Sequence, residues 1–284
     1  MKVISKVTRL RSRIARLKLS PVGFVPTMGA LHQGHLSLVE KAVSESPLVV
    51  VSIYVNPAQF NDPDDLKNYP RTPDNDLSIL CRVMRKNDIV FLPGDSEIYP
   101  EEDNRNFSFG NLDLVMEAKH RPGHFNGVAK VVTRLFDIVR PDIAYFGIKD
   151  LQQLAVIRKL TALAGNMIRI EGCPIVREPD GLAMSSRNML LEPSIRAKAG
   201  IIFRTLSEAV EMIRERPISE IKQYVNSKID SVPGFSAEYF EIADDTDLVP
   251  VEENNQLQEG KNYYACIAVR AGRIRLIDNI GIAL

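Results

Sequence analysis

Two histidines, His32 and His35, lie close to Gly34 where an apolar stretch gives way to a helix-like run over 36–42. An apolar strand that enters a glycine-bearing turn and leaves as a helix directs free backbone N–H groups and a positive dipole end toward an anion. Imidazoles can hydrogen-bond phosphate oxygens and, when protonated, offset their charge. Because Gly29 and Gly34 lack a Cβ, the backbone can approach a ligand closely here. The spacing therefore predicts a nucleotide-phosphate site.

The same histidines admit two other interpretations. A glycine-bearing turn of this kind is ordinary α/β architecture, so the imidazoles could be structural. The chain has four histidines, in the close pairs His32 with His35 and His120 with His124, and four imidazoles could make a tetrahedral zinc site. A Pro-Gly dipeptide inside the second pair breaks any helix that would aim those two rings together, and no cysteine lies near either pair. The phosphate site is therefore favoured over the zinc site.

Further polar side chains follow runs that have the composition of buried parallel strands. Asn56 and Gln59 come after the β-branched run 48–55, and Lys149 and Asp150 come after another apolar run. Ligands of open parallel sheets bind beyond the carboxyl ends of the strands, so we expect these side chains at the substrate site. Lys149 could hold phosphate oxygens, whereas Asp150 could cap the next helix or approach a metal. An Asn-Pro turn and a surface Lys-Asp pair are the alternatives that involve no ligand.

Two serines beside an arginine form another candidate phosphate-binding set. Ser185, Ser186 and Arg187 follow a predicted turn at 179–181, and their hydroxyl and guanidinium groups are a compact set of donors.

Strand-like and helix-like segments alternate through the first part of the chain. Strands are expected at 48–55, 88–92, 143–146 and 167–170, helices at 8–18, 36–42, 72–86 and 128–139, and loops at 61–71 and 121–127. After about residue 177 the pattern changes to helices at 194–214 and 218–229 and then strands at 237–242 and 263–277, the latter turning at 271–272. This change predicts two domains, 1–176 and 177–284, the second one a smaller α+β domain.

Composition restricts the class of partner. The chain of 284 residues has 36 basic and 36 acidic side chains, so no overall field favours nucleic acid or an anionic membrane, and we expect small-molecule substrates. Cys81, Cys173 and Cys266 are scattered, which indicates a reducing compartment. No apolar run is long enough to cross a bilayer, and Met1 to Ile4 does not open a signal peptide. The expected location is the cytoplasm.

The chain resembles the pantothenate synthetase (pantoate–β-alanine ligase) family in six blocks that follow one another between about residues 22 and 190. They are Pro-Thr-Met-Gly-Ala-Leu-His-Gln-Gly-His at 26–35, Val-Asn-Pro-Ala-Gln-Phe at 55–60, Tyr-Pro-Arg-Thr at 69–72, Pro-Gly-His-Phe-Asn-Gly-Val at 122–128, Phe-Gly-Ile-Lys-Asp-Leu-Gln-Gln-Leu at 146–154 and Asp-Gly-Leu-Ala-Met-Ser-Ser-Arg-Asn at 180–188. A His-x-Gly-His motif alone is shared with nucleotidylyltransferases and class I aminoacyl-tRNA synthetases, whereas six blocks in this order are highly specific.

The resemblance implies a fold and a reaction. The fold is α/β, with a Rossmann-like nucleotidyltransferase domain built on a parallel sheet and a smaller α+β C-terminal domain that acts as a lid. The reaction joins (R)-pantoate to β-alanine and uses ATP and Mg²⁺. The pantoate carboxylate attacks the α-phosphorus of ATP to give pantoyl adenylate and pyrophosphate, and the amine of β-alanine then displaces AMP. The resemblance also implies a homodimer.

The resemblance further implies roles for individual residues. His35 would donate a proton near the phosphates, with His32 and Lys149 as further catalytic residues. Gln59 and Gln153 would hold pantoate, and Gln59 would also border β-alanine; an amide suits such a ligand because it both donates and accepts hydrogen bonds. The implied ATP site comprises Met28, Gly29, Ala30, Leu31, His32, Gln33, Gly34, His35, Gly147, Ile148, Lys149, Asp150, Val176, Met184, Ser185, Ser186 and Arg187.

Two residues depart from the family pattern. Ala58 stands where methionine is most often expected, and Ile148 stands where a polar residue is common. These departures affect details of pocket shape.

Two rival functions remain. One is a nucleotidylyltransferase that makes a dinucleotide with the same two histidines, and the other is a catalytically silent nucleotide-binding protein on the same fold. A tRNA synthetase is disfavoured because the chain has no basic surplus.

Overall fold

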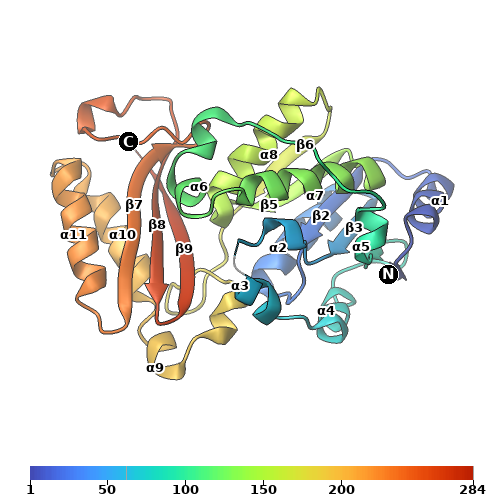
Figure 1. Cartoon of the computed structure of the whole chain (residues 1–284), viewed down its shortest axis with the longest axis horizontal. Helices are drawn as coiled ribbons and strands as arrows, with labels where there is room; N and C mark the ends of the chain where they lie inside the picture. Colours follow the sequence, from blue (N-terminus) through green and yellow to red (C-terminus); the bar gives the residue numbers. More distant parts are fainter. Residues whose placement is uncertain (62, 284) are drawn as a thin grey trace.

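A computed structural model describes residues 1–61 and 63–283. Its larger part is built on a parallel sheet with the strand order β1-β4-β3-β2-β5-β6. Figure 1 labels β2, β3, β5 and β6 of this sheet. The strands are β1 (Lys2–Ile4), β2 (Val22–Thr27), β3 (Leu48–Ile53), β4 (Ile89–Phe91), β5 (Ile143–Gly147) and β6 (Arg169–Cys173). The chain builds outward from β2 toward β4 and then returns to add β5 on the other side of β2. Such a reversal opens a crevice beyond the carboxyl ends of the central strands, where ligands of open α/β sheets bind.

Helices cover both faces of this sheet. Successive strand residues point to opposite faces, so Phe24 belongs to the core beneath α1, α7 and α8, whereas Val25 belongs to the core beneath α2 and α4. All residues of β3 are buried, which explains its unbroken apolar run. The covering helices are α1 (Val7–Leu17), α2 (Gln33–Glu45), α4 (Pro73–Leu80), α7 (His124–Val139) and α8 (Leu151–Leu163).

The C-terminal part is an antiparallel sheet with helices on one face. The strands β7 (Phe235–Asp244), β8 (Tyr263–Ala271) and β9 (Ile274–Ile282) form a meander, against which α10 (Ile201–Met212) and α11 (Ile218–Asp230) pack. The other face meets the larger part, because Cys266 and Tyr239 join the core around α7 and α8. The predicted class, a Rossmann-like domain with a smaller α+β domain, is confirmed. No helix within the described residues is long and apolar enough to cross a bilayer.

Several predicted segments have different bounds in the structure. The helix predicted over 72–86 ends at Leu80. The chain then turns, and the backbone N–H and the guanidinium of Arg85 donate to the buried carboxylate of Asp88. The loop predicted over 121–127 is wrong in its second half, since α7 already begins at His124. The predicted strand over 167–170 shifts to Arg169–Cys173, and Met167 is 98% exposed.

Other segments were missed or divided. The predicted loop over 61–71 contains the short helix α3 (Pro63–Asn68), and β1 was not predicted because its three residues are ordered only by pairing with β4. The helix predicted over 194–214 is divided into α9 (Pro193–Arg196) and α10, since consecutive i to i+3 hydrogen bonds between them tighten the chain. Two further short helices are α5 (Asp95–Ile98) and α6 (Met116–His120).

Candidate active site

A cleft of about 230 Å³ opens beyond the carboxyl ends of β2, β3 and β5. The segments 174–176 and 184–187, which follow β6, line it as well. Many of the residues predicted from sequence meet here: Met28, His32, Gly34, His35, Gln59, Gly147, Lys149, Asp150, Gln153, Val176, Met184, Ser185, Ser186 and Arg187. Five other predicted residues are not among the described residues that line it: Gly29, Ala30, Leu31, Gln33 and Ile148. The cleft therefore gathers cations, imidazoles and amides from stretches far apart in sequence.

The helix α2 begins with two histidines whose rings accept backbone N–H groups at its N-terminus. His32 is the N-cap, and its Nδ1 accepts the N–H of Gly34 at 3.1 Å, while Nδ1 of His35 accepts the N–H of His32 at 3.3 Å. A ring nitrogen that accepts a hydrogen bond carries no proton, so each neutral ring holds its proton on Nε2. The ring centroids are 4.1 Å apart. Two Nε2–H donors are therefore held side by side at the cleft.

The electrostatics of the cleft keep both rings neutral. Burial is the largest cause that lowers the pKa of His35, and together with the neighbouring His32 and Lys149 it brings that pKa to about 3. Burial and then Lys149 lower the pKa of His32 to about 4, although Asp150 raises it. Near pH 7 these rings therefore donate hydrogen bonds as neutral imidazoles. A polyanion beside them would favour the imidazolium form and raise both pKa values.

The turn before α2 does not offer the free N–H groups that the sequence pattern suggests. The buried carboxylate of Asp76 accepts the N–H of Ala30 at 3.0 Å and that of Leu31 at 2.8 Å, and it also accepts the hydroxyl of Thr72 at 3.1 Å. The N–H of Gly29, whose φ is +81°, is directed to the hydroxyl of Thr27. The expectation of free donors at these positions is wrong because a carboxylate from α4 already occupies them.

Two amides beyond β3 are fixed by contacts with the turn and with α7. The side chain of Asn56 is fully buried, and its Nδ2 donates to the carbonyl of Gly127 at 3.1 Å and to Oε1 of Gln59 at 3.3 Å. Nε2 of Gln59 lies 2.8 Å from the sulfur of Met28. A Cβ on Gly127 would lie 2.1 Å from the carbonyl oxygen of Ala58, so this close packing of α7 requires glycine. The amide of Gln59 is thus placed at the cleft by three separate elements.

The Lys149 segment is held by the C-terminal sheet. Asn279 of β9 is buried, and its Nδ2 donates to the carbonyls of Ile148 at 2.9 Å and Lys149 at 3.0 Å. Nζ of Lys149 lies 3.7 Å from Oδ1 of Asp150. Gln153 follows in the first turn of α8 and lines the cleft. The backbone that carries the lysine therefore depends on a residue from the second sheet.

Arg187 forms an ion pair across the mouth of the cleft. Its guanidinium lies 2.9 Å from Oδ2 of Asp65 in α3 and 5.6 Å from the centroid of the Tyr69 ring. The hydroxyl of Ser186 donates to the carbonyl of Ala30 at 3.0 Å, which ties the segment to the turn after β2. Both members of the ion pair are partly exposed. The cation predicted to bind phosphate thus already has a carboxylate partner.

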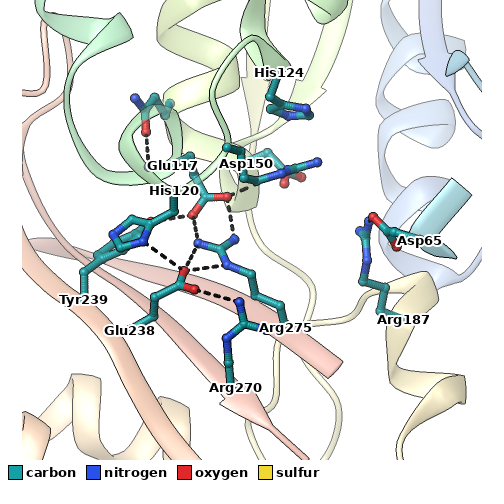
Figure 2. Close-up of polar contacts among 12 residues, drawn as sticks. Asp65, Glu117, His120, His124, Asp150, Arg187, Glu238, Tyr239, Arg270 and Arg275 are labelled. Carbon is teal, nitrogen blue, oxygen red and sulfur yellow. Dashed lines mark hydrogen bonds and ion pairs between the residues drawn. The ribbon is translucent and has the colours of Figure 1, made fainter. Parts of the chain in front are cut away.

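A charged network joins α6 to the C-terminal sheet. In Figure 2, Glu117 faces Arg275 and Tyr239, while Glu238 lies among His120, Arg270 and Arg275. Both oxygens of Glu117 lie 2.7 Å from the guanidinium of Arg275, and the hydroxyl of Tyr239 donates to Glu117 at 2.8 Å. Burial alone would raise the pKa of Glu117, but Arg275 outweighs it and the pKa is lowered. The network fixes one face of the second sheet against the larger part of the molecule.

The four histidines do not form a metal site. His120 lies against Tyr239 with ring centroids 5.5 Å apart, whereas Nδ1 of His124 bonds the carbonyl of Gln59 at 2.7 Å. Among the described residues, no three His, Cys, Asp or Glu side chains are grouped so that they could hold a metal ion. The zinc alternative is therefore not supported.

Sequence reasoning missed several residues that shape the cleft. Three of them hold residues of the cleft in place from segments that carry no sequence motif, so no local signal indicated them: Asp76, Asn279 and Asp65. Arg121 and His124 also line it. Arg121 directly precedes the sequence block at 122–128 and His124 belongs to it, so the sequence did contain a signal, but no role was assigned to either residue.

The parallel sheet with its imidazole pair and Lys149 defines an α/β protein of the nucleotidyltransferase type. A family model described as "Pantoate-beta-alanine ligase" matches residues 2–281. The chain belongs to this family.

Individual relatives agree with that assignment. The pantothenate synthetase of Phocaeicola vulgatus is 48% identical over 284 residues, which is 99% of each chain. The crystal structure of the pantothenate synthetase from Thermus thermophilus has a TM-score of 0.89 at 40% identity and covers 99% of each chain. The pantoate-beta-alanine ligase from Francisella tularensis, solved as a complex with beta-gamma ATP and beta-alanine, has a TM-score of 0.78 at 33% identity, covering 99% of this chain and 97% of that one.

Proposed function

We propose that the cleft joins (R)-pantoate to β-alanine at the expense of ATP, through a pantoyl adenylate. The observation that carries the proposal is the meeting of two kinds of group in one cleft. His32, His35 and Lys149 suit a polyphosphate, while Gln59 and Gln153 suit a ligand that presents hydroxyls and a carboxylate. A site that only bound a nucleotide would have no need of the paired amides.

In the first step, a carboxylate oxygen of pantoate attacks the α-phosphorus of ATP. The new O–P bond forms as the bond to the β-phosphate bridging oxygen breaks, and pyrophosphate leaves with that electron pair. The Nε2–H groups of His32 and His35 and the ammonium of Lys149 donate to the phosphate oxygens on which charge develops. Groups held in place before the reaction lower its barrier, because they need not reorganise. The imidazoles of His32 and His35 have this property, because a backbone N–H donated to each Nδ1 holds the ring in place.

In the second step, the unprotonated amine of β-alanine attacks the acyl carbon, and AMP leaves with the electrons of the anhydride bond. The substrate ammonium loses one proton before the attack and a second proton as the amide forms. A carboxylate by itself is unreactive because oxide is a poor leaving group, whereas AMP is a good one. The adenylate must be shielded from water until the amine reacts. We propose that residues 177–284 act as the lid in this process and residues 1–176 as the catalytic domain.

The groups lining the cleft fit a magnesium ion that arrives with ATP. Mg²⁺ prefers oxygen ligands and is commonly bound by one or two carboxylates together with substrate phosphates. Asp150 is the acidic residue among the described residues that line the cleft, and its side chain is 46% exposed. We propose that Asp150 would hold the ion, which would offset phosphate charge.

The proposed assignment extends to the remaining residues and to the setting. Val176, Met184, Ser185, Ser186 and Arg187 would complete the ATP site together with the glycine turn after β2. The enzyme would act in the cytoplasm as a homodimer. The three free cysteines are compatible with that compartment.

A coupled assay of AMP and pyrophosphate release tests the proposal. ATP and magnesium would be supplied with pantoate and β-alanine together and with each one omitted. We expect AMP release only when both are present, with pantothenate as the product. His35→Ala should slow the reaction by about a hundredfold, as is typical when one preorganised donor is removed. AMP release without either substrate, or none with folded protein, would favour the rival functions.

A further inference from the structure

A groove of about 600 Å³ runs between α1 and β1, the strand at one edge of the parallel sheet. It is lined by residues 2–5 and by one side of the helix. Among the described residues, none lines both this groove and the cleft. In Figure 1, α1 and the N-terminus lie at the end of the molecule opposite the C-terminal sheet. The groove is therefore separate from the site of the proposed reaction.

The packing of α1 turns a basic side of the helix toward this groove. Leu10 is buried in the core, and Val7, Ile14 and Leu17 pack against that core. These residues recur every three or four positions, so they fix the rotation of the helix about its axis. The side that lines the groove carries three arginines at i, i+4 and i+7: Arg9, Arg13 and Arg16.

The cations of the groove have no anionic partner. Within residues 1–61 and 63–283, Lys2 and the three arginines form no ion pair, and no acidic side chain lines the groove. Two other cations at α1 do have partners. Nζ of Lys6 lies 2.9 Å from Oε1 of Glu97, and the guanidinium of Arg11 donates to the carbonyl of Asp137 at 3.2 Å. Because like charges three or four positions apart on a helix repel each other, an anion in the groove would relieve that repulsion.

Arg13 provides a second, independent observation. Its Nε is buried and has no hydrogen-bond acceptor in the part of the chain that the structure describes. Buried donors are almost always paired, since an unpaired one has lost its hydrogen bond to water. Arg13 lines the groove, so an anion seated there would supply the acceptor that its Nε lacks.

The other groups of the groove indicate the class of anion. Guanidinium groups pair bidentately with phosphate oxygens, and Ser5, Thr8 and Ser12 place three hydroxyl donors along the same groove. No aromatic side chain is among the described residues that line it, so a nucleic-acid base would find no ring on which to stack. Three arginines and one lysine suit a compact ligand that carries several phosphates.

We propose that the groove between α1 and β1 binds a small polyphosphorylated anion, whose phosphates pair with Arg9, Arg13 and Arg16. Nε of Arg13 donates to one phosphate oxygen, and Lys2 offsets charge from the side of the strand. This site goes beyond the function proposed for the cleft and does not depend on it. A ligand that binds the folded chain alone stabilises that chain, so its binding would hold the first strand and helix together.

NMR of the arginine Nε–H groups follows the groove directly, with inorganic tripolyphosphate as the probe. The Arg13 signal is assigned by its absence from the Arg13→Lys protein. We expect this signal to shift as tripolyphosphate is added, and to shift equally in a Lys149→Ala protein, whose cleft lacks one of its cations. An Arg13 signal that does not move, or that moves only when Lys149 is present, would overturn the proposal.

Isothermal titration calorimetry in the Lys149→Ala background measures the contribution of each cation. Arg13→Gln should weaken tripolyphosphate binding about 10- to 100-fold, the usual range for a hydrogen bond to a charged group. Arg9→Gln and Arg16→Gln should weaken it by about fivefold or less, because both side chains are exposed.

Arg11→Gln is the matched control, because it removes the same charge from the same helix outside the groove. It should keep the affinity for tripolyphosphate. Equal losses in Arg11→Gln and Arg13→Gln would mean that only the general charge of the helix attracts the anion, and would overturn the assignment.

Melting temperatures distinguish a ligand site from a structural role. Without ligand, Arg13→Gln should melt at the wild-type temperature or above it, because the substitution removes no ion pair and lessens the repulsion. Tripolyphosphate should raise the melting temperature of Arg11→Gln as much as that of the wild type, and that of Arg13→Gln less. A lower melting temperature with unchanged tripolyphosphate binding would give Arg13 a structural role instead.

Hexaglutamate and a short single-stranded oligonucleotide test the class of ligand. At equal ionic strength we expect both to bind the groove more weakly than tripolyphosphate. Tighter binding of either one would identify an acidic peptide or a nucleic acid as the ligand and overturn the assignment to a small polyphosphate. These measurements use neither pantoate nor an amine, so their outcome is independent of the function proposed for the cleft.

Discussion

At the turn after β2, the carboxylate of Asp76 and two imidazoles accept hydrogen bonds from backbone N–H groups. At the mouth of the cleft, by contrast, a partly exposed ion pair joins Arg187 to Asp65. The first region is buried and its donors have fixed partners. The second can exchange one anion for another at little cost, because half-exposed ion pairs contribute at most about 1 kcal/mol. The floor of the cleft is therefore set before a ligand binds, while the rim is held by a contact that a polyphosphate can replace.

The largest expected effect comes from removing the carboxylate that supports the floor. Asp76→Ala would leave the N–H groups of Ala30 and Leu31 buried without an acceptor, and each such loss costs about 1–3 kcal/mol. We expect the free energy of unfolding to fall by roughly 2–5 kcal/mol in urea denaturation, together with a loss of AMP release. Asp74→Ala on the same helix is the control and should change little. A loss below about 1 kcal/mol would show that water replaces the carboxylate readily.

A smaller but still clear effect is expected where α7 touches the turn beyond β3. Gly127→Ala would place a Cβ 2.1 Å from the carbonyl oxygen of Ala58. The backbone would have to shift, which typically costs about 1–3 kcal/mol and would displace Gln59. We expect a lower melting temperature and a higher KM for pantoate. Gly94→Ala is the control, since a Cβ there meets no atom within 4 Å; equal effects of both substitutions would contradict this packing argument.

The three neutral histidines that line the cleft predict a pH dependence of stability. The pKa values of His32 and His124 are lowered to about 4 and that of His35 to about 3, from 6.5. Between these values the unfolded chain binds protons that the folded chain does not. The contribution to stability is therefore complete above pH 6.5 and is lost as the pH falls toward 4 and 3.

Ring-proton NMR would check this assignment. We expect the three histidines to show no titration above about pH 5, and addition of pyrophosphate to raise the titration points of His32 and His35. Rings that titrate near pH 6.5 without an anion would show that the floor is more open to water than the contacts indicate.

The smallest effect is expected at the rim. Asp65→Asn removes the partner of Arg187 and leaves the guanidinium free for phosphate oxygens. We expect pyrophosphate to inhibit the variant more strongly, by less than about fivefold, because a half-exposed ion pair is worth at most about 1 kcal/mol. Stability should hardly change. Asp74→Asn removes the same charge away from Arg187 and is the control; weaker inhibition of the Asp65 variant would mean that the pair supports phosphate binding instead.

The strands and the main turns could be predicted because their signals are local. The unbroken apolar run of β3 and the periodic pattern of α7 identify buried elements wherever they pack. The first turn of α7 escaped prediction, since a Pro-Gly pair before His124 resembles a loop although glycine at φ +80° can also begin a helix. The three-residue strand β1 exists only through its neighbour β4.

Many of the residues that line the cleft could be predicted from the sequence, but the hydrogen bonds that hold them in place could not. Sequence blocks identified His35, Gln59, Lys149 and Arg187, and the fold brings all of them to one cleft. No pattern could show that Asp76, 46 residues from Ala30, takes the backbone donors expected to face a ligand. Nor could it show which ring nitrogen of each histidine holds the proton, because that depends on the individual hydrogen-bond partners.

The hydrogen bonds from Asn279 to the carbonyls of Ile148 and Lys149 have a consequence for the order of synthesis. Asn279 follows Lys149 by 130 residues. All six strands of the parallel sheet are therefore synthesised well before Asn279. The backbone at Ile148 and Lys149 lacks these two hydrogen bonds until β9 has left the ribosome and paired with β8. A nascent chain that has finished its first domain is thus expected to remain inactive, and activity should appear only when the last strand of the second sheet is in place.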